Sequence, residues 1–350
     1  MKPVAGREKP SPQDREKKGA GAVKPVVTLD QWRETASPPW LTSPGGRPTR
    51  AGVMQQNSEH QAETPFLAGL ESVAARYDVI LCDVWGVVHN GLKAFEAAGD
   101  ALTRFRAGGG CVVLVSNAPR PGAAVLRMLD KLNVMHSAFD AIVTSGDLTR
   151  TAIAERPGQA VFHLGPERDY SLFKDLDVRF GGVEDAAYVV CSGFFDDERE
   201  TVEDYRPMLE RMRARNLWMI CANPDLVVER GDRLIPCAGA IAHAYEERGG
   251  EVLYTGKPHR PIYEAALARA AELRGGARVE TARVLAIGDA IRTDVAGAAA
   301  LGIPALFVTR GIHAAELASP DGTTDARLVR KWLAQQAVQP MAFTDRLVWR

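Results

Sequence analysis

The sequence predicts an α/β fold built on a doubly wound parallel sheet. Two observations lead to this prediction: short, almost continuous apolar runs recur from residue 64 onward, and amphipathic segments of helical length separate them. Strands that are apolar along their whole length are typical of a sheet covered on both faces. Strands that alternate with helices are typical of βαβ units, in which neighbouring strands run parallel.

The strands and helices follow from this pattern in chain order. The runs predicted as buried strands are Val79–Val88, Cys111–Val115, Ala141–Val143, Tyr188–Cys191, Leu217–Cys221, Arg283–Ile287 and Ala305–Val308. The segments predicted as helices are Phe95–Ala107, Gly122–Leu132, Arg260–Leu273 and Asp294–Leu301, with a further surface helix over Asp325–Val338. The closing segment Arg346–Arg350 matches no pattern.

Composition indicates an ordinary globular protein. The chain has 350 residues, of which 46% are hydrophobic and 25% are charged, so it is long enough for two domains. The formal net charge of −1 offers no bulk electrostatic reason to expect nucleic acid or a membrane as partner. No run approaches the roughly 20 apolar residues of a membrane helix, and the N-terminus lacks the apolar core of a signal peptide.

Two further features concern the compartment and the N-terminus. The five cysteines are odd in number and include no C-x-x-C pair, which predicts reduced core thiols in a cytoplasmic protein. Residues 1–62 are polar and rich in Pro, Gly and charge, so they are predicted to be a disordered N-terminal extension. Trp32 and Trp40 leave open a short docking motif within it.

Polar residues follow the first two apolar runs. In an open parallel sheet, ligands bind at the carboxyl ends of the strands. Asp83 closes the first run, where a carboxylate is costly unless it is paired or used. Ser116 and Asn117 follow the second run and could grip an anion through a hydroxyl and an amide. The alternatives are a capping role for Asp83 and an N-cap, formed by Ser116 and Asn117, before the helix near Pro121.

Lysine and paired carboxylates occur later in the chain. Lys257 stands between Gly256 and Pro258, and its alternative role is a solvated surface charge. Asp289 closes an apolar run and Asp294 follows five residues later. Paired carboxylates with a third from elsewhere form an oxygen-rich site suited to Mg²⁺, whereas the alternative is two N-capping acids.

Taken together, these residues are the parts needed to attack a phosphoryl group. A carboxylate nucleophile such as Asp83 splits hydrolysis into two steps through an aspartyl-phosphate. Mg²⁺ neutralises charge, while Ser116, Asn117 and Lys257 are candidates to hold the remaining phosphate oxygens. A nucleotide-dependent enzyme and a zinc site are disfavoured, because no glycine-rich phosphate loop and no His/Cys cluster with zinc spacing is present.

In this order, the motifs resemble those of the haloacid dehalogenase superfamily, and more narrowly its class IIA (NagD-like) hydrolases, over about residues 70–315. The resemblance implies a Rossmann-like core. It also implies that Asp83 is the catalytic nucleophile and that Ser116 and Lys257 hold the phosphoryl group. Mg²⁺ is the implied cofactor.

The resemblance also implies the ligands of the metal and exposes one departure. Asp83, Asp289 and the backbone carbonyl of Trp85 would bind the metal, with Asp294 supporting it directly or through another group. Phosphatases of the family carry Asp-x-Asp at the first motif, and the second Asp protonates the leaving group. Here Trp85 stands at that position, and indole cannot act as a general acid near neutral pH.

Loss of a positioned general acid typically lowers the rate about 10²–10⁴-fold. The loss would matter least for a good leaving group such as an acyl phosphate. His89 or a cap residue is a candidate replacement. Trp85 itself is expected either to stack on a planar substrate or to fill the mouth of the sheet.

The insert between the second and third motifs resembles the family's α/β cap. The expected organisation is a discontinuous core of residues 63–156 and 249–350, with the cap formed by residues 157–248. Asn223 and Asp225, in an Asn-Pro-Asp triplet, are candidates for organising the cap and contacting substrate, although such a triplet is also a common turn.

The sequence thus predicts a Mg²⁺-dependent phosphatase of a small phosphorylated metabolite. Two alternatives remain open because of Trp85. One is a catalytically impaired protein that binds a phosphorylated ligand or a partner, and the other is a hydrolase of a non-phosphate bond that still uses Asp83. Caps of this kind often mediate dimers, so the resemblance also implies a possible homodimer.

Overall fold

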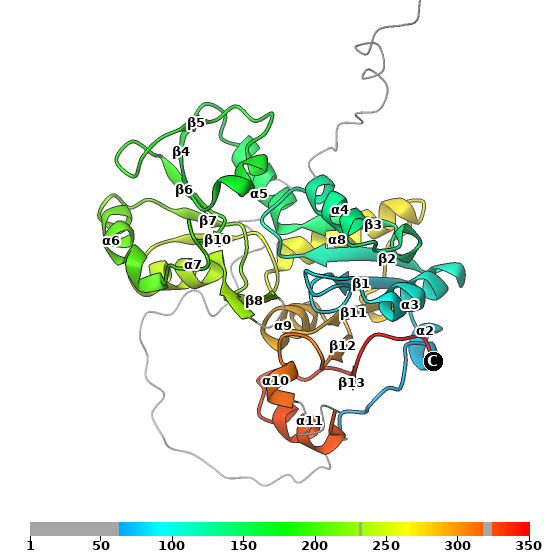
Figure 1. The fold of residues 1–350 in the computed structure, drawn as a ribbon. Helices are drawn as coiled ribbons and strands as arrows, with labels where there is room; N and C mark the ends of the chain where they lie inside the picture. The colour runs from blue at the N-terminus through cyan, green and yellow to red at the C-terminus, as the bar shows by residue number, and fades with distance from the viewer. Residues whose placement is uncertain (1–62, 231–232, 318–323) are drawn as a thin grey trace, which may run out of the picture.

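A computed structural model describes residues 63–230, 233–317 and 324–350 (Figure 1). The predicted disorder of residues 1–62 lies outside this range. The described chain forms two parallel sheets, each covered by helices, and a small antiparallel ribbon. The predicted α/β class with parallel sheets is therefore confirmed.

The first sheet has the strand order β13-β12-β11-β1-β2-β3, and every neighbouring pair in it is parallel. The chain moves from β1 to one side through β2 and β3, and later fills the other side with β11, β12 and β13. This reversal beside β1 is where an open parallel sheet offers a crevice for ligands. The strands are β1 (Val79–Asp83), β2 (Cys111–Ser116), β3 (Ala141–Thr144), β11 (Val284–Gly288), β12 (Ala305–Val308) and β13 (Ala342–Thr344).

Helices cover both faces of this sheet. Side chains alternate along β1 as strand geometry requires: Ile80 and Cys82 belong to one apolar cluster, and Val79 and Leu81 to the other. The first cluster includes residues of α3 (Glu96–Ala107) and α4 (Gly122–Lys131), and the second includes residues of α8 (Arg260–Leu273), α9 (Ala296–Ala300) and α11 (Ala326–Leu333). The double cover explains why the central strands are apolar throughout.

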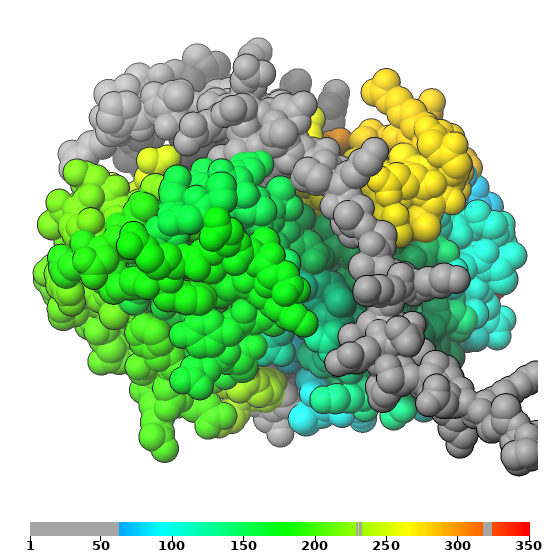
Figure 2. Space-filling view, turned by 90° about the horizontal axis from the view of Figure 1, so that it is seen from above, coloured from blue at the N-terminus to red at the C-terminus, as the bar shows by residue number. Residues whose placement is uncertain are grey.

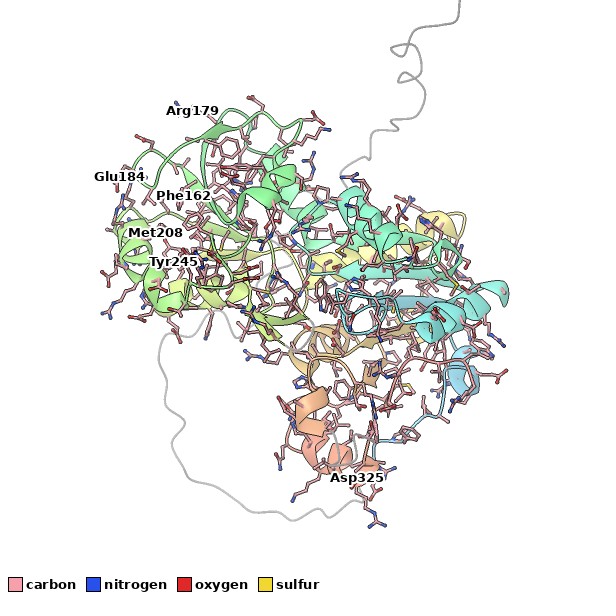
Figure 3. The ribbon with its side chains drawn as sticks, in the orientation of Figure 1. Phe162, Arg179, Glu184, Met208, Tyr245 and Asp325 are labelled. Carbon is pink, nitrogen blue, oxygen red and sulfur yellow. The ribbon has the colours of Figure 1, made fainter. Side chains whose placement is uncertain are left out.

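The second sheet has the order β10-β7-β6-β4-β5 and is also parallel. Its strands are β4 (Ala160–Leu164), β5 (Arg179–Phe180), β6 (Tyr188–Cys191), β7 (Met219–Cys221) and β10 (Val252–Tyr254). Around it lie α5 (Ser145–Ala154), α6 (Arg206–Ala214) and α7 (Ala238–Glu247), and the ribbon consists of β8 (Val227–Arg230) and β9 (Arg233–Pro236). Phe162, Met208 and Tyr245 lie in this part of the molecule (Figure 3). We call it the second domain.

The bounds of the second domain are best drawn from its sheet. β10 lies after residue 248, where the cap was expected to end, yet it pairs with β7. Ala152 and Ile153 of α5 share an apolar cluster with the second sheet, although they precede residue 157. We therefore propose that the second domain spans about residues 145–254. From above, it lies as a green mass beside the cyan and yellow parts of the first domain (Figure 2).

Short elements complete the described chain. They are α2 (Glu71–Ala74), η3 (His136–Ala138), η4 (Glu167–Leu172), η5 (Val202–Tyr205), η6 (Thr281–Arg283), the π-helical turn η7 (Ile291–Val295) and α10 (Ala314–Leu317). The helix predicted from Asp294 is in fact this π-helical turn followed by α9. All five cysteines are buried and free, as the sequence predicted.

Two predictions of extent were wrong. The first strand was expected to reach Val88 but ends at Asp83, because the chain then turns through Gly86, whose φ is +81°. The turn is itself buried against the core, so its valines continue the apolar run without being a strand. The helix predicted to Val338 ends at Leu333.

The uninterpreted C-terminal segment closes the first domain. Leu347 is buried in the core, and the carbonyl groups of Val348 and Trp349 accept hydrogen bonds of 2.9 Å from the amides of Leu70 and Glu71. The segment therefore satisfies the first amides of α2. The segment forms these hydrogen bonds with residues that lie far from it in the chain, and no local sequence pattern reveals them.

Candidate active site

The predicted residues meet at the carboxyl edge of the first sheet. Asp83 is the last residue of β1, Ser116 is the last of β2, and Asp289 directly follows β11. They border a cavity of about 450 Å³, which residues of the second domain, including Arg168 and Arg230, also border. A cavity of this size is typical of small-molecule sites.

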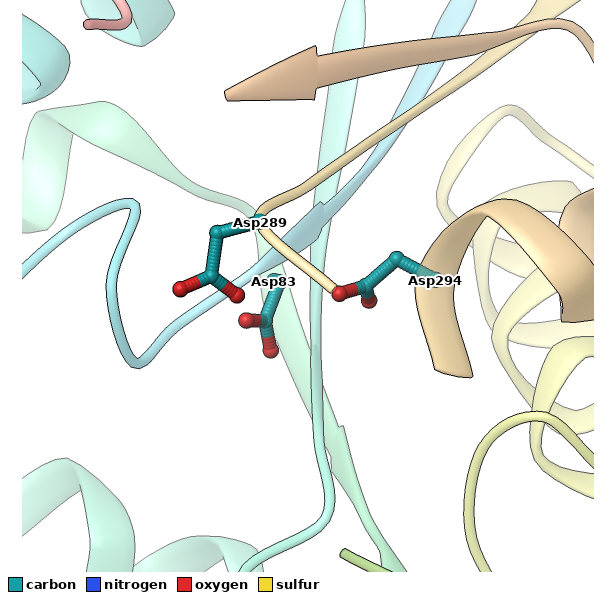
Figure 4. A group of neighbouring side chains, drawn as sticks. All are labelled: Asp83, Asp289 and Asp294. Carbon is teal, nitrogen blue, oxygen red and sulfur yellow. The ribbon is translucent and has the colours of Figure 1, made fainter. Parts of the chain in front are cut away.

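Three carboxylates that border the cavity lie close to one another (Figure 4). Asp83, Asp289 and Asp294 each offer an oxygen, and these three atoms lie within 4.8 Å of one another. All three residues are buried. The amide of Ile312 donates to Asp289 Oδ2 at 2.8 Å, which orients that carboxylate. Clustered carboxylate oxygens are the ligands that Mg²⁺ prefers, so these residues fit the metal implied by the sequence.

Asp289 lies between two glycines. A Cβ atom at Gly86 or at Gly311 would come within 1.9 Å of Asp289 Oδ2, and larger residues therefore have no room there. Gly311 follows β12, whose carboxyl end lies at the same edge of the sheet. The contribution of Gly311 and Ile312 was not predicted, although the rule that ligands gather at strand ends also applies to β12.

Lys257 is the cation within this acidic group. Its Nζ donates to Asp83 Oδ1 at 2.5 Å and to Asp294 Oδ1 at 2.7 Å, and the residue is only 3% exposed. Burial alone would lower the pKa of Lys257, but Asp294 and Asp83 raise it well above its usual value. Burial, reinforced by Asp294, raises the pKa of Asp83 despite this contact. The site is therefore short of positive charge.

An amide joins the two domains beside this lysine. Asn117 Oδ1 accepts from the amide of Lys257 at 2.7 Å. Asn117 Nδ2 donates to the carbonyl of Lys257 at 3.1 Å and to Asp225 Oδ1 at 2.9 Å. Asn223 Oδ1 in turn accepts from the amide of Asp225 at 3.0 Å. The structure thus brings Asn223 and Asp225 to the predicted site, and Asn117 uses both polar side-chain atoms in these contacts.

Close packing around Asn117 leaves no room for a side chain at Gly256, so a substitution there is predicted to lower stability. A Cβ atom at Gly256 would lie 2.4 Å from Asn117 Oδ1 and 2.7 Å from Pro224 Cδ. We expect Gly256→Ala to lower the free energy of unfolding by about 1–3 kcal/mol, since overpacking shifts the neighbours. Urea unfolding followed by fluorescence measures the change. Gly182→Ala is the matched control, because a Cβ there meets no atom within 4 Å; equal effects of the two changes would refute the prediction.

Trp85 and His89 form the wall beside Asp83. The indole lies at the cavity, half-buried, and its ring centroid is 4.9 Å from that of His89 in an edge-on arrangement. His89 is completely buried, and its Nδ1 accepts from the amide of Gly91 at 2.9 Å. Burial lowers the pKa of His89 to about 4, so the imidazole is neutral near pH 7.

Ion pairs at the far end of the cavity were not predicted. Arg120, in the loop after β2, pairs at 3.0 Å with Asp169 of η4 and so links the two domains. Asp197 pairs with Arg168 and, at 3.1 Å, with Arg230. Asp169 and Arg168 follow β4, a strand that was not predicted, so the rule that ligands gather at strand ends could not point to them.

Comparisons with known proteins agree with the fold. Residues 80–179 match a family described as haloacid dehalogenase-like hydrolase, and residues 254–331 match a HAD-hydrolase-like family. A crystal structure of a haloacid dehalogenase-like hydrolase from Brucella suis 1330 is 48% identical, with a TM-score of 0.71. That match covers 81% of this chain and 100% of the Brucella chain.

More distant matches carry a specific name. D-glycerol 3-phosphate phosphatase of Mycobacterium tuberculosis is 28% identical over 251 residues, which cover 70% of this chain and 67% of that protein. A structure of glycerol phosphate phosphatase from Mycobacterium tuberculosis in complex with magnesium is 26% identical, with a TM-score of 0.53. It covers 75% of this chain and 79% of the other.

One further property concerns the helices. Among the described residues, no helix is long and apolar enough to cross a membrane.

Three findings lead to one assignment: the parallel-sheet core, the order of the motifs and the match to the whole of the Brucella chain. The chain belongs to the haloacid dehalogenase superfamily of hydrolases, and its features fit the class IIA, NagD-like group.

Proposed function

We propose that the protein is a Mg²⁺-dependent phosphatase of a small phosphorylated compound and that it acts through an aspartyl-phosphate on Asp83. The observation that carries this proposal is the contact of Lys257 with both Asp83 and Asp294, beside the third carboxylate of Asp289. This contact supports the proposal, because a carboxylate, a buried cation and an acidic cluster lie together beside a cavity of suitable size.

In this proposal each residue has a defined task. Asp83 attacks the phosphorus atom, while the Ser116 hydroxyl and the Lys257 ammonium hold phosphate oxygens. Asp83, Asp289, Asp294 and the backbone carbonyl of Trp85 would hold Mg²⁺, which when bound neutralises charge between the nucleophile and the phosphate. Such chemistry depends mainly on positioning and on electrostatic stabilisation.

Asn117 receives a different task from the one first expected. Its side-chain oxygen and nitrogen are already bonded to Lys257 and Asp225. We therefore propose that Asn117 positions these two residues, and that Ser116 and Lys257 provide the side-chain contacts to phosphate. Ser116 Oγ accepts from the amide of Ala118 at 3.2 Å, which leaves its hydroxyl hydrogen for a phosphate oxygen.

The relatives support this function. A curated relative is named D-glycerol 3-phosphate phosphatase, and a similar solved structure, named glycerol phosphate phosphatase and from the same organism, contains magnesium. The proposed partner is accordingly a small phosphorylated substrate, not nucleic acid or a membrane. A cytoplasmic location, supported by the free cysteines, and a homodimer are further proposals. Light scattering coupled to size-exclusion chromatography tests the dimer.

The function is tested by phosphate release. We expect the protein to release phosphate from at least one member of a panel of alkyl, aryl and acyl phosphates, and we expect EDTA to abolish the release and Mg²⁺ to restore it. Folded protein that releases no phosphate, yet melts at a higher temperature with a phosphorylated compound, would instead support the impaired, ligand-binding alternative. Turnover of a carboxylic ester or a halide without phosphatase activity would support the non-phosphate hydrolase.

A further inference from the structure

The proposed reaction needs a proton donor that Trp85 cannot supply. In an in-line displacement, the attacking oxygen of Asp83 and the leaving oxygen lie on opposite sides of the phosphorus. The leaving oxygen therefore faces away from β1, into the part of the cavity bordered by the second domain. The donor must be a titratable group on that side.

Two acids of the second domain border the cavity but are held in ion pairs. Asp169 contacts Arg120 at 3.0 Å, and Asp197 contacts both Arg168 and Arg230. Burial raises the pKa of Asp197, but its contacts with Arg230 and Arg168 outweigh burial and lower that pKa below its usual value, so its carboxylate keeps no proton to give. Burial raises the pKa of Asp169, opposed by Arg120, but the residue is only 2% exposed and its carboxylate accepts from Arg120, so little of it is open to a substrate.

His89 and Cys237 are also unsuitable. The imidazole of His89 has no exposed surface, and its pKa of about 4 leaves it without a second proton near neutral pH. The thiol of Cys237 borders the cavity, but burial raises its pKa far above the usual value and so moves it away from the working pH, near which the pKa of an efficient general acid lies.

Asp225 has the geometry that the others lack. It lies on the loop after β7 and borders the same cavity as Asp83. Its Oδ1 accepts from Asn117, a neutral amide, and no described residue contacts its Oδ2 within hydrogen-bond distance. Asp225 is half-buried, which leaves part of its surface accessible from the cavity. No described arginine, lysine or histidine forms an ion pair with it.

The position of Asp225 is held from several sides. Asn117 ties it to the backbone of Lys257, and Asn223 Oδ1 accepts from its amide. α7 approaches so closely that a Cβ atom at Gly239 would lie 2.5 Å from the carbonyl oxygen of Asp225. The carboxyl group is thus fixed next to the proposed phosphate site although it belongs to the second domain.

We propose that Asp225 is the general acid of the reaction and takes over the task that Trp85 cannot perform. This rests on the proposed phosphatase function. As the bond from Asp83 to phosphorus forms and the bond from phosphorus to the leaving oxygen breaks, the proton of Asp225 passes to that oxygen. In the second step the Asp225 carboxylate accepts a proton from the attacking water, phosphate leaves Asp83, and the acid is restored.

The electrostatic surroundings of Asp225 suit this task. Burial raises its pKa to about 6, opposed by Lys257 and the Asn117 hydrogen bond and reinforced by Asp294. The remaining titratable groups that interact with it electrostatically are Asp83, Cys221 and Cys237. A carboxyl group with a pKa near the working pH can both release and regain a proton, as an acid–base catalyst must.

The test compares two aryl phosphates of similar shape. 4-Nitrophenyl phosphate has a stable leaving phenolate that needs no proton, whereas the phenolate of phenyl phosphate is far more basic. We expect Asp225→Asn, with Mg²⁺ present, to lower kcat/KM for phenyl phosphate about 10²–10⁴-fold and for 4-nitrophenyl phosphate by about tenfold or less. The amide keeps the size and the Asn117 hydrogen bond of the carboxylate. Asp197→Asn removes a carboxylate from the same cavity and should change both rates by one common factor.

The outcomes separate this inference from the function on which it rests. Failure of the wild type to hydrolyse any phosphate ester would overturn the phosphatase itself. Wild-type activity together with equal losses on both substrates in Asp225→Asn would leave the phosphatase intact and overturn the general acid. If Asp225→Asn does not fold, a series of substituted phenyl phosphates with the wild type decides. A shallow dependence of kcat/KM on leaving-group basicity is expected, and a steep one would contradict the proposal.

Discussion

Asp83→Asn is expected to lower kcat for phosphate release by about 10⁴–10⁶-fold, the range seen when a residue of a catalytic unit is removed. The amide has nearly the size of the carboxylate, so the buried cavity around it is preserved. It lacks the negative oxygen that would attack phosphorus. It also removes one of the two carboxylates that Lys257 contacts and one of the three proposed metal ligands.

A covalent readout makes this result specific. Wild-type protein mixed with substrate and quenched in acid should carry one phosphoryl group on the peptide that contains Asp83, whereas Asp83→Asn should carry none. Asp78→Asn is the matched control: Asp78 adjoins the opposite end of the same strand, where it pairs with Arg283 and Arg274. The Asp78→Asn variant should keep its phosphatase activity. Full turnover by Asp83→Asn would mean that water attacks phosphorus directly.

Much of the fold was predictable because the central strands are buried on both faces. Apolar runs such as Cys111–Val115 need no tertiary information to be recognised, and β2 differs from that prediction by one residue. β4 was missed because His163 interrupts its apolar pattern. In the structure that histidine is buried, with Nε2 2.9 Å from Ser192 Oγ and its ring beside Phe173. A polar residue satisfied by a distant partner looks like a surface residue in the sequence.

The candidate site was predictable to a similar degree and for a related reason. Asp83, Ser116 and Asp289 each follow an apolar run, and parallel strands bring such ends to one edge. The hydrogen bonds of Asn117 with Lys257 and Asp225 were not predictable, since these partners lie 140 and 108 positions away from it in the chain. The Asn-Pro-Asp triplet drew attention to Asp225, but the local sequence does not show that its carboxylate bonds to a neutral amide, whereas that of Asp197 lies between two arginines.

For the acidic cluster we predict that Asp289→Asn raises the stability of the metal-free protein but removes the stabilisation by Mg²⁺. Lys257 contacts Asp83 and Asp294, but no described basic side chain lies within ion-pair distance of Asp289. Burial, with Asp83 and Asp294 nearby, raises the pKa of Asp289 well above 3.8. Because the pKa of Asp289 is higher in the folded state than in the unfolded state, its ionised form destabilises the metal-free fold. This destabilisation grows as the pH rises from the unfolded-state pKa to the folded-state pKa. Asp289→Asn should therefore raise the Tm of the metal-free protein at neutral pH.

The same substitution should remove the response to metal. A ligand present at 100 times its Kd stabilises a fold by about 2.7 kcal/mol, so excess Mg²⁺ should raise the wild-type Tm by several degrees. Asp289→Asn should lose this rise together with about 10³-fold or more in activity, since a metal supplies several kcal/mol of transition-state stabilisation. Thermal melts in EDTA and in excess Mg²⁺ measure both effects.

Asp294→Asn sharpens the comparison because Asp294, unlike Asp289, contacts Lys257. Removing it should also abolish the Mg²⁺ response, but it takes a partner from a buried ammonium and should lower the metal-free Tm. A Mg²⁺-dependent rise that survived Asp289→Asn would place the metal elsewhere. Metal-free melting temperatures that moved the same way in both variants would show that charge crowding at Asp289 does not limit stability. The two variants are thus expected to shift the metal-free Tm in opposite directions, and both are expected to lose the rise in Tm with Mg²⁺. This combination is expected only if the three carboxylates form one cation site in which Lys257 neutralises Asp83 and Asp294.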